Sequence, residues 1–204
     1  EIEVLGWLIN NYVFDKYKNK KASQAYLVRP KKINNERVLK FAEAEALARN
    51  LINTPTSEMG PEDLASAVKN LSNKFDAEYS EIVGKNLIQQ NFPLIHAVGR
   101  ASAQEPRLLE IKNGSSGPKV TLVGKGVCFD TGGLNIKPGR SMGLMKKDMG
   151  GAANVLALAS MILSTGMNIQ LRVLIPAVEN SISGNSFRPG DILTARNGST
   201  VEIN

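Results

Sequence analysis

Apolar residues recur at helical spacing over the segment Glu36–Asn53. Val38, Phe41, Ala44 and Ala48 fall three or four positions apart, the spacing that places side chains on one face of a helix. The polar residues between them would then face solvent. The pattern therefore predicts one long amphipathic helix that ends before the following loop.

The rest of the chain alternates between strand-like and helix-like patterns. Pro61, followed by two acidic residues, is typical of a helix start. Further helical patterns run near Glu81–Gln90 and over Gly150–Leu163. Runs rich in β-branched and apolar residues predict strands at Tyr26–Pro30, Phe75–Tyr79, Leu94–Val98, Leu108–Ile111, Val120–Val123 and Ile169–Ile175. Strands that alternate with helices predict an α/β fold whose sheet carries helices on both faces.

The last residues predict a β-hairpin. Asn197-Gly198 is a strong turn signal, and the flanking segments Ile192–Ala195 and Thr200–Ile203 have strand character. The strand pattern then runs to Asn204 without a polar tail or a helix cap. We therefore expect that these residues are part of a longer chain.

Composition indicates an ordinary folded protein. Hydrophobic residues make up 42% and charged residues 22% of the 204 residues, which argues against disorder and allows one large domain, or one domain with part of a second. The apolar run Val155–Leu163 is shorter than the ~20 residues that a membrane helix needs. With one cysteine, Cys128, no internal disulfide can form. We expect a cytoplasmic protein with no membrane partner.

The net charge of +6 reflects basic residues crowded near the start of the chain. They are Lys16, Lys18, Lys20, Lys21, Arg29, Lys31 and Lys32. Such a run could contact nucleic acid, but no aromatic stacking pattern accompanies it. A solvated surface is the simpler interpretation.

The stretch Leu122–Ala159 combines many glycines and alanines with isolated charged residues, among them Lys125, Asp130, Lys137 and Asp148. Small residues permit tight turns and close backbone approach, so the fold could bring these four side chains together. Nucleotide binding is disfavoured, because neither the P-loop nor the dinucleotide glycine spacing is present. An Asp-Thr-Gly triplet begins at Asp130 and matches the aspartic proteases, but the helical pattern soon after it contradicts their all-β fold.

Metal binding explains the four residues better. Asp130 and Asp148 are of the type that holds divalent cations, and one carboxylate can bridge two ions. A lysine can join them only as a neutral amine, and a neighbouring pair of divalent ions can displace its proton. Two simpler interpretations stay open here: Lys125 could form an ion pair with Asp130, and the aspartates could cap a turn and a helix.

The segment GKGVCFDTGGLNIKP…MGLMKKDMGGAANV resembles the metal-binding segment of the cytosolic leucyl aminopeptidase family. The spacing carries the match: Asp130 follows Lys125 by five residues, Lys137 follows by seven more, and Asp148 by eleven more. The segments LINTPTSEMGPEDLA, FPLIHAVGRAS and RPGDILTARNGSTVEIN are also similar to the family at corresponding points. The resemblance implies part of a mixed-sheet catalytic domain. It divides the chain into the end of an N-terminal domain (1–33), an interdomain helix (34–54) and the N-terminal part of the catalytic domain (55–204).

By this resemblance the site would hold two divalent ions, zinc or manganese. Asp130 would bridge both ions, and Lys125 and Asp148 would complete the tighter site. Lys137 would be catalytic, donating a hydrogen bond to the substrate carbonyl and stabilising the oxyanion. A bicarbonate ion is expected to serve as the base in the complete site.

Met145 and Asn204 correspond to family residues that line the pocket for the first side chain of the substrate. An apolar Met145 suits leucine-like residues, although simple core packing explains it equally well. The implied substrates are peptides with a free N-terminus. His96, the sole histidine, lies in a predicted apolar strand, and we expect a core residue rather than a metal ligand.

The family pattern continues beyond Asn204 with a Thr-Asp-Ala-Glu-Gly-Arg segment, which supplies two further ligands and an arginine. The resemblance therefore implies that these 204 residues alone are inactive. It also implies a homohexamer. Because some family members bind DNA and this chain is basic, a DNA-binding regulator on the same scaffold is the alternative function.

Overall fold

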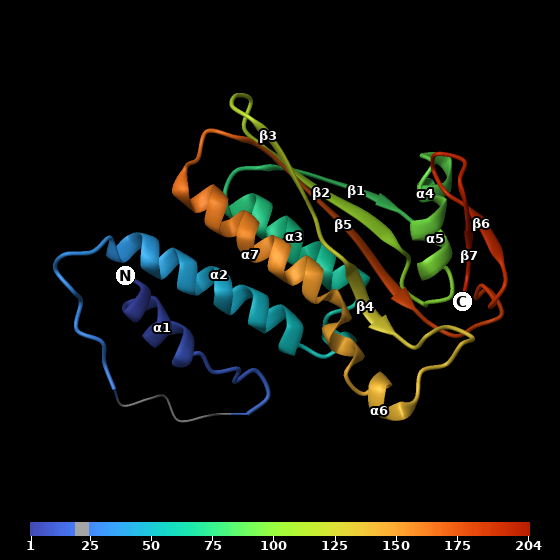
Figure 1. The fold of residues 1–204 in the computed structure, drawn as a ribbon, viewed down its shortest axis with the longest axis horizontal. Helices are drawn as coiled ribbons and strands as arrows, with labels where there is room; N and C mark the ends of the chain where they lie inside the picture. The colour runs from blue at the N-terminus through green and yellow to red at the C-terminus, as the bar shows by residue number, and fades with distance from the viewer. Residues whose placement is uncertain (19–24) are drawn as a thin grey trace.

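The computed structural model describes residues 1–18 and 25–204. Figure 1 shows a twisted sheet with a layer of long helices beside it. The strands are β1 (Glu78–Val83), β2 (Arg107–Asn113), β3 (Lys119–Val123), β4 (Gly126–Asp130), β5 (Gln170–Asn180), β6 (Ile192–Thr194) and β7 (Thr200–Glu202). The α-helices are α1 (Ile2–Asn10), α2 (Asn35–Asn53), α3 (Pro61–Lys74), α4 (Asn86–Gln89), α5 (Pro93–Gly99), α6 (Gly139–Met142) and α7 (Gly150–Thr165), and the 3₁₀ helices are η1 (Thr56–Glu58) and η2 (Met145–Met149).

The main sheet is mixed, as expected. Its order is β1-β2-β5-β3, with β4 also paired to β5. The β1–β2 and β2–β5 pairs are antiparallel, whereas β3 and β4 both run parallel to β5. The long β5 thus pairs with β3 along its first half and with β4 along its second half. In that second pairing, Asp130 lies opposite Asn180 at the carboxyl end of both strands.

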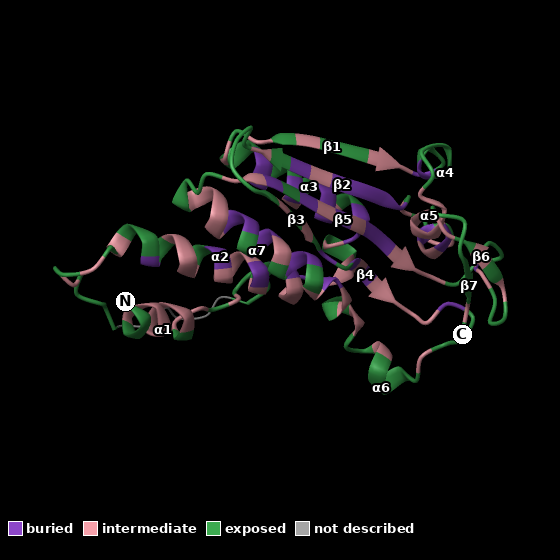
Figure 2. Cartoon of the chain, turned by 45° about the horizontal axis from the view of Figure 1, so that its top comes forward, coloured by how far each residue is buried: buried purple, intermediate pink, exposed green. Residues whose placement is uncertain are grey.

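One face of this sheet carries the hydrophobic core. Alternate residues of β5, such as Val173 and Ile175, are buried, and Figure 2 shows buried positions along β2 and β5 and on the neighbouring helix α7. Leu64 and Val68 of α3 and Leu156 of α7 belong to the same cluster. Burying each such side chain stabilises the fold by roughly 1.5–3 kcal/mol, so this interface holds α3 and α7 against the sheet.

The opposite face is covered only at one end by the described residues. There α5 contacts β2 and β5, and Leu108 and Val178 are buried. Elsewhere this face presents ion-paired residues, such as Glu110 with Arg172, and the exposed Val123. Helices therefore lie on both faces, but the second face is covered in part.

The long helix α2 confirms the first sequence pattern. The side chain of Asn34 accepts a hydrogen bond from the Arg37 N–H and caps its start, and Ala44 and Ala48 are buried on its inner face. The predicted strand Tyr26–Pro30 is wrong: this segment is irregular. Pro30 has no N–H to donate, and no strand of the described residues pairs with this segment.

Two further strand predictions need correction. Leu94–Val98 is part of the helix α5, because Pro93 occupies the first turn, where proline favours helix. The strand expected at Phe75–Tyr79 begins only at Glu78, since Asp76 takes a left-handed turn conformation with φ of 51°. The strand then continues through Val83, so the helix expected over Glu81–Gln90 shrinks to α4.

The C-terminal residues form the predicted hairpin, whereas the basic run near the start of the chain is described only in part. The hairpin β6–β7 is confirmed, with Gly198 at φ of 86° in its turn. Lys20 and Lys21 of the basic run lie outside the described residues, and Lys16 forms an ion pair with Glu58. Every helix of the described residues is too short or too polar to span a membrane.

Candidate metal centre

The glycine-rich segment places β4 against the start of α7, and the glycines allow a close approach. A Cβ on Gly124 would lie 2.7 Å from Cα of Ala152, and one on Gly151 would lie 3.0 Å from the backbone nitrogen of Lys125. The Ala152 N–H donates to the Lys125 carbonyl at 2.9 Å. Strand β4 was not predicted, because its mixed sequence carries neither a strict alternation nor an apolar run.

Lys125 follows β3 and forms an ion pair with Asp148, at 2.8 Å between Nζ and Oδ1. The Lys125 side chain is 59% exposed, whereas that of Asp148 is 15% exposed. The second oxygen of Asp148, Oδ2, is buried and has no hydrogen-bond partner among the described residues. An unpartnered buried carboxylate oxygen is costly, so a water molecule, a ligand or a cation at this atom would stabilise the fold.

Asp130 ends β4 in a polar cluster. Its Oδ1 accepts hydrogen bonds from the Gly132 N–H and from Asn180 Nδ2, each at 2.8 Å, and Lys137 Nζ lies 3.2 Å from Oδ2. Burial favours a raised pKa for Asp130, but these two hydrogen bonds and the Lys137 ammonium outweigh it and hold the pKa below its usual value. Asp130 is therefore a stable carboxylate.

Both plain interpretations of these residues can now be judged. Lys125 pairs with Asp148 rather than Asp130, and Asp130 pairs instead with Lys137. Asp130 does stabilise a turn through the Gly132 N–H. The side chain of Asp148 does not cap α7, whose N-cap residue is Met149.

Asn180 is the site residue that the sequence reasoning missed. It reaches Asp130 because β4 and β5 end side by side. The signal was a polar residue at the end of a buried strand, in the place where ligands collect in open α/β sheets. The contact of Asn180 with Asp130 could not be predicted without knowing that β4 pairs with β5.

The two expected substrate-binding residues lie in different parts of the chain. Met145 is half-buried at the first position of η2, the same short helix that carries Asp148. Asn204 is exposed and follows β7 in the two-stranded sheet. Met145 thus lies on the same short helix as Asp148, whereas Asn204 lies on a separate element.

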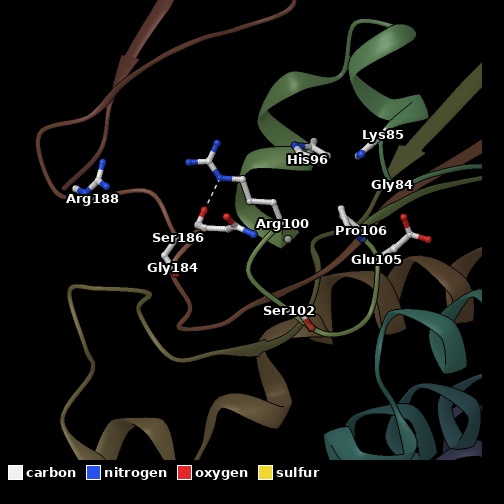
Figure 3. Close-up of a pocket in the computed structure, with 12 residues that line it drawn as sticks. Gly84, Lys85, His96, Arg100, Ser102, Glu105, Pro106, Gly184, Ser186 and Arg188 are labelled. Carbon is white, nitrogen blue, oxygen red and sulfur yellow. Dashed lines mark hydrogen bonds between the residues drawn. The ribbon is translucent and has the colours of Figure 1, made fainter.

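His96 and Cys128 have environments that keep them out of this centre. His96 lies on α5 and lines a separate pocket (Figure 3); it is half-buried, so the expected core histidine in a strand is wrong. Cys128 is buried in β4, and burial raises the pKa of its thiol well above the usual range.

The described residues include donors of the kind that bind divalent cations, but no full cluster of them. Within residues 1–18 and 25–204, no group of three or more histidine, cysteine, aspartate or glutamate side chains is placed to hold an ion. However, the buried Asp148 Oδ2 without a partner and the ionised Asp130 are hard oxygen donors, and Lys125 is an amine beside Asp148. This donor set fits a divalent cation.

Comparison with known proteins identifies the family. Residues 46–204, starting within α2, match the model of the cytosol aminopeptidase family, catalytic domain. A probable cytosol aminopeptidase from Aquifex aeolicus is 38% identical over 97% of this chain and 42% of its own length.

Solved structures agree with this match. The cytosol aminopeptidase from Coxiella burnetii is 46% identical with a TM-score of 0.93, over 98% of this chain and 43% of that one. The bottromycin maturation enzyme BotP in complex with Mn is 32% identical with a TM-score of 0.87, over 97% and 43%. The chain thus spans less than half the length of these relatives. With a family match over most of its residues and a mixed α/β fold in common, the chain belongs to the cytosol aminopeptidase family.

Proposed function

We propose that the protein containing this chain is a metal-dependent aminopeptidase, which removes leucine-like residues from the free N-terminus of peptides. The observation that carries the proposal is the buried Asp148 Oδ2, which has no partner among the described residues and lies on the carboxylate that Lys125 contacts. Family membership supplies the reaction class. Peptide substrates and a homohexameric assembly are parts of the proposal that follow from the family resemblance.

Lys125, Asp130 and Asp148 would hold the cations, together with donors from outside the described residues. Two divalent ions there, zinc or manganese, would polarise the substrate carbonyl and make bound water more acidic. The Mn bound by BotP supports a divalent ion in this fold. Bicarbonate as the base is a further part of the proposal.

The chain's own residues would orient these groups. Gly132 N–H and Asn180 Nδ2 both donate to Asp130 Oδ1, so they fix the carboxylate and keep it ionised. Lys125 would have to lose its proton to bind a cation. Since that proton now contacts Asp148, cation binding would exchange the Lys125–Asp148 ion pair for two metal–ligand contacts.

Lys137 would act on the substrate rather than the metal. Its Nζ is held at 3.2 Å from Asp130 Oδ2 and its side chain is 32% exposed, so it can reach a carbonyl oxygen bound beside Asp130. There it would donate a hydrogen bond and stabilise the oxyanion. Met145 would line the pocket for the first side chain of the peptide, and Asn204 would join it.

Replacement of Asp130 tests the proposal directly. In the full-length protein, Asp130→Asn should abolish the metal-dependent release of leucine from a leucyl-p-nitroanilide substrate and lower the bound metal measured by atomic emission. Asp15→Asn, an exposed aspartate remote in sequence from the centre, is the matched control and should keep both. Full activity in Asp130→Asn would refute the assignment.

A further inference from the structure

A polar pocket of about 520 Å³ lies outside the lysine–aspartate centre (Lys125, Asp130, Lys137 and Asp148). It is formed by the turn after β1, the helix α5, the loop before β2 and the loop that follows β5 (Figure 3). Its volume falls within the ~300–1,000 Å³ usual for small-molecule sites. None of Lys125, Asp130, Lys137 or Asp148 lines it.

Three cationic side chains from separate segments line this pocket. Lys85 follows β1, Arg100 follows α5, and Arg188 belongs to the loop after β5. Within the part of the chain that the structure describes, none of the three forms an ion pair, unlike Lys125 and Lys137. Figure 3 shows Lys85 and Arg188 on opposite sides of the cavity, with Arg100 between them.

Arg100 is held in place without being neutralised. Its Nε donates to the carbonyl of Asn185 at 2.6 Å, the contact dashed in Figure 3. That bond joins α5 to the loop after β5 and uses only one of the five N–H donors of the guanidinium. The terminal nitrogens remain for a ligand, in the fork geometry that suits carboxylate and phosphate oxygens.

Acidic side chains do not compensate this charge inside the pocket. Glu105 lines it, but its carboxylate packs against Gly84, where an added Cβ would meet Oε1 at 2.0 Å, and Figure 3 shows it directed away from Arg100. The nearby Glu179 accepts a hydrogen bond from Ser102 at 2.8 Å. Burial, and then the charges of Arg100 and Lys85, lower the pKa of His96, as expected where positive charges gather.

We propose that this pocket binds a small phosphate-bearing anion, held by Lys85, Arg100 and Arg188. Two planar guanidinium groups and one ammonium match the several oxygens of a phosphate better than the two of a single carboxylate. The cavity is larger than inorganic phosphate alone requires, so the ligand is a diphosphate or an organic phosphate. This inference does not depend on the peptidase proposal.

Calorimetric titration with pyrophosphate tests the site. In the full-length protein at about 0.15 M salt, where exposed charges are screened beyond ~8 Å, the wild type should bind with a measurable heat. Arg188→Gln and Lys85→Gln should each weaken binding by roughly tenfold or more, the loss expected for a charge-assisted hydrogen bond. Lys69→Gln makes the same charge change on the exposed side of α3 and should bind like the wild type. Equal affinity in all four proteins, or no binding, would overturn the proposal.

The ring of His96 provides a second, independent measure of pyrophosphate binding. Pyrophosphate beside Lys85 and Arg100 should offset their charge and raise the pKa of His96, which proton NMR can follow at the ring signal that is lost in His96→Asn. The shift should vanish in Arg188→Gln and persist in Lys69→Gln. An unchanged His96 titration, or binding of a DNA duplex with no binding of pyrophosphate, would also count against the site.

Discussion

The lysine–aspartate centre and the pocket beside α5 differ in whether their cationic side chains form ion pairs. In the centre, Lys125 and Lys137 each contact an aspartate whose side chain is less than one-fifth exposed. In the pocket, the side chains of Lys85, Arg100 and Arg188 form no ion pair within the described residues, although the Arg188 backbone N–H donates to Asp191 Oδ2 at 2.8 Å. The first arrangement can admit a divalent cation when a lysine gives up its proton. The second keeps unpaired positive charges, which favour an anion.

Replacement of Lys125 should have the largest effect, which is a loss of metal affinity. Lys125→Gln keeps a hydrogen-bond donor to Asp148 but removes the amine ligand. We expect metal affinity to fall more than about 100-fold, because even partners of metal ligands contribute 10–100-fold. Metal titration of the full-length protein by competition with a chelating dye measures this. Lys147→Gln, an exposed neighbour in η2, is the control; unchanged affinity in Lys125→Gln would remove Lys125 from the ligand set.

Lys137 should affect turnover without affecting metal. Lys137→Met removes the proposed donor to the substrate oxyanion, and such donors contribute about 100-fold or more to kcat. Metal content should stay at the wild-type level, since Lys137 Nζ contacts Asp130 Oδ2 and is not itself a proposed metal ligand. Steady-state kinetics with a leucyl substrate, together with metal analysis of the same sample, separates the two lysines. A loss of bound metal in Lys137→Met would show that Lys137 also supports metal binding, and would contradict separate roles for Lys125 and Lys137.

The glycines that build the centre should be costly to replace. In Gly124→Ala the new methyl would meet backbone atoms of Ala152 and Gly151, at 2.7 and 3.0 Å, which cannot move without shifting α7. We expect a loss of about 1–3 kcal/mol in the free energy of unfolding, as for other overpacked sites. Urea denaturation followed by circular dichroism measures it.

Gly6→Ala is the matched control for this substitution. Gly6 lies inside α1 with nothing near its added Cβ, so alanine should be neutral or stabilise by up to about 1 kcal/mol. Equal effects at Gly6 and Gly124 would mean that the close approach of β4 and α7 is not what requires glycine at position 124.

The sequence predicted the elements with long patterns and missed those that depend on tertiary contacts. The long periodic helix α2 and the buried strand β2 were predictable, because their patterns extend over several turns or alternations. The spacing from Lys125 to Asp148 likewise marked the residues that form the ion pairs. Helix α5 was not predictable, since a short apolar run fits a strand or a helix equally well. Asn180 and the pocket cations also escaped, because only tertiary contacts bring their segments together.

The smallest expected effect concerns acid stability at the pocket. Burial and the charges of Arg100 and Lys85 hold the pKa of His96 below its usual value of about 6.5. Between about 6.5 and that lowered value, the unfolded chain binds the proton more readily, so the free energy of unfolding should fall as the pH drops through this window. His96→Asn removes this contribution.

The pH dependence should be measured without phosphate, which would occupy the proposed site. Urea midpoints of the wild type and His96→Asn, compared from pH 7.5 down to about 5, should converge or cross as the wild type loses stability. The variant Arg100→Gln should lessen the wild-type dependence, because it removes one of the charges that lower the pKa of His96. Parallel curves for the wild type and His96→Asn would show that the histidine does not sense the pocket charge, and would weaken the contrast between this pocket and the charge-paired centre.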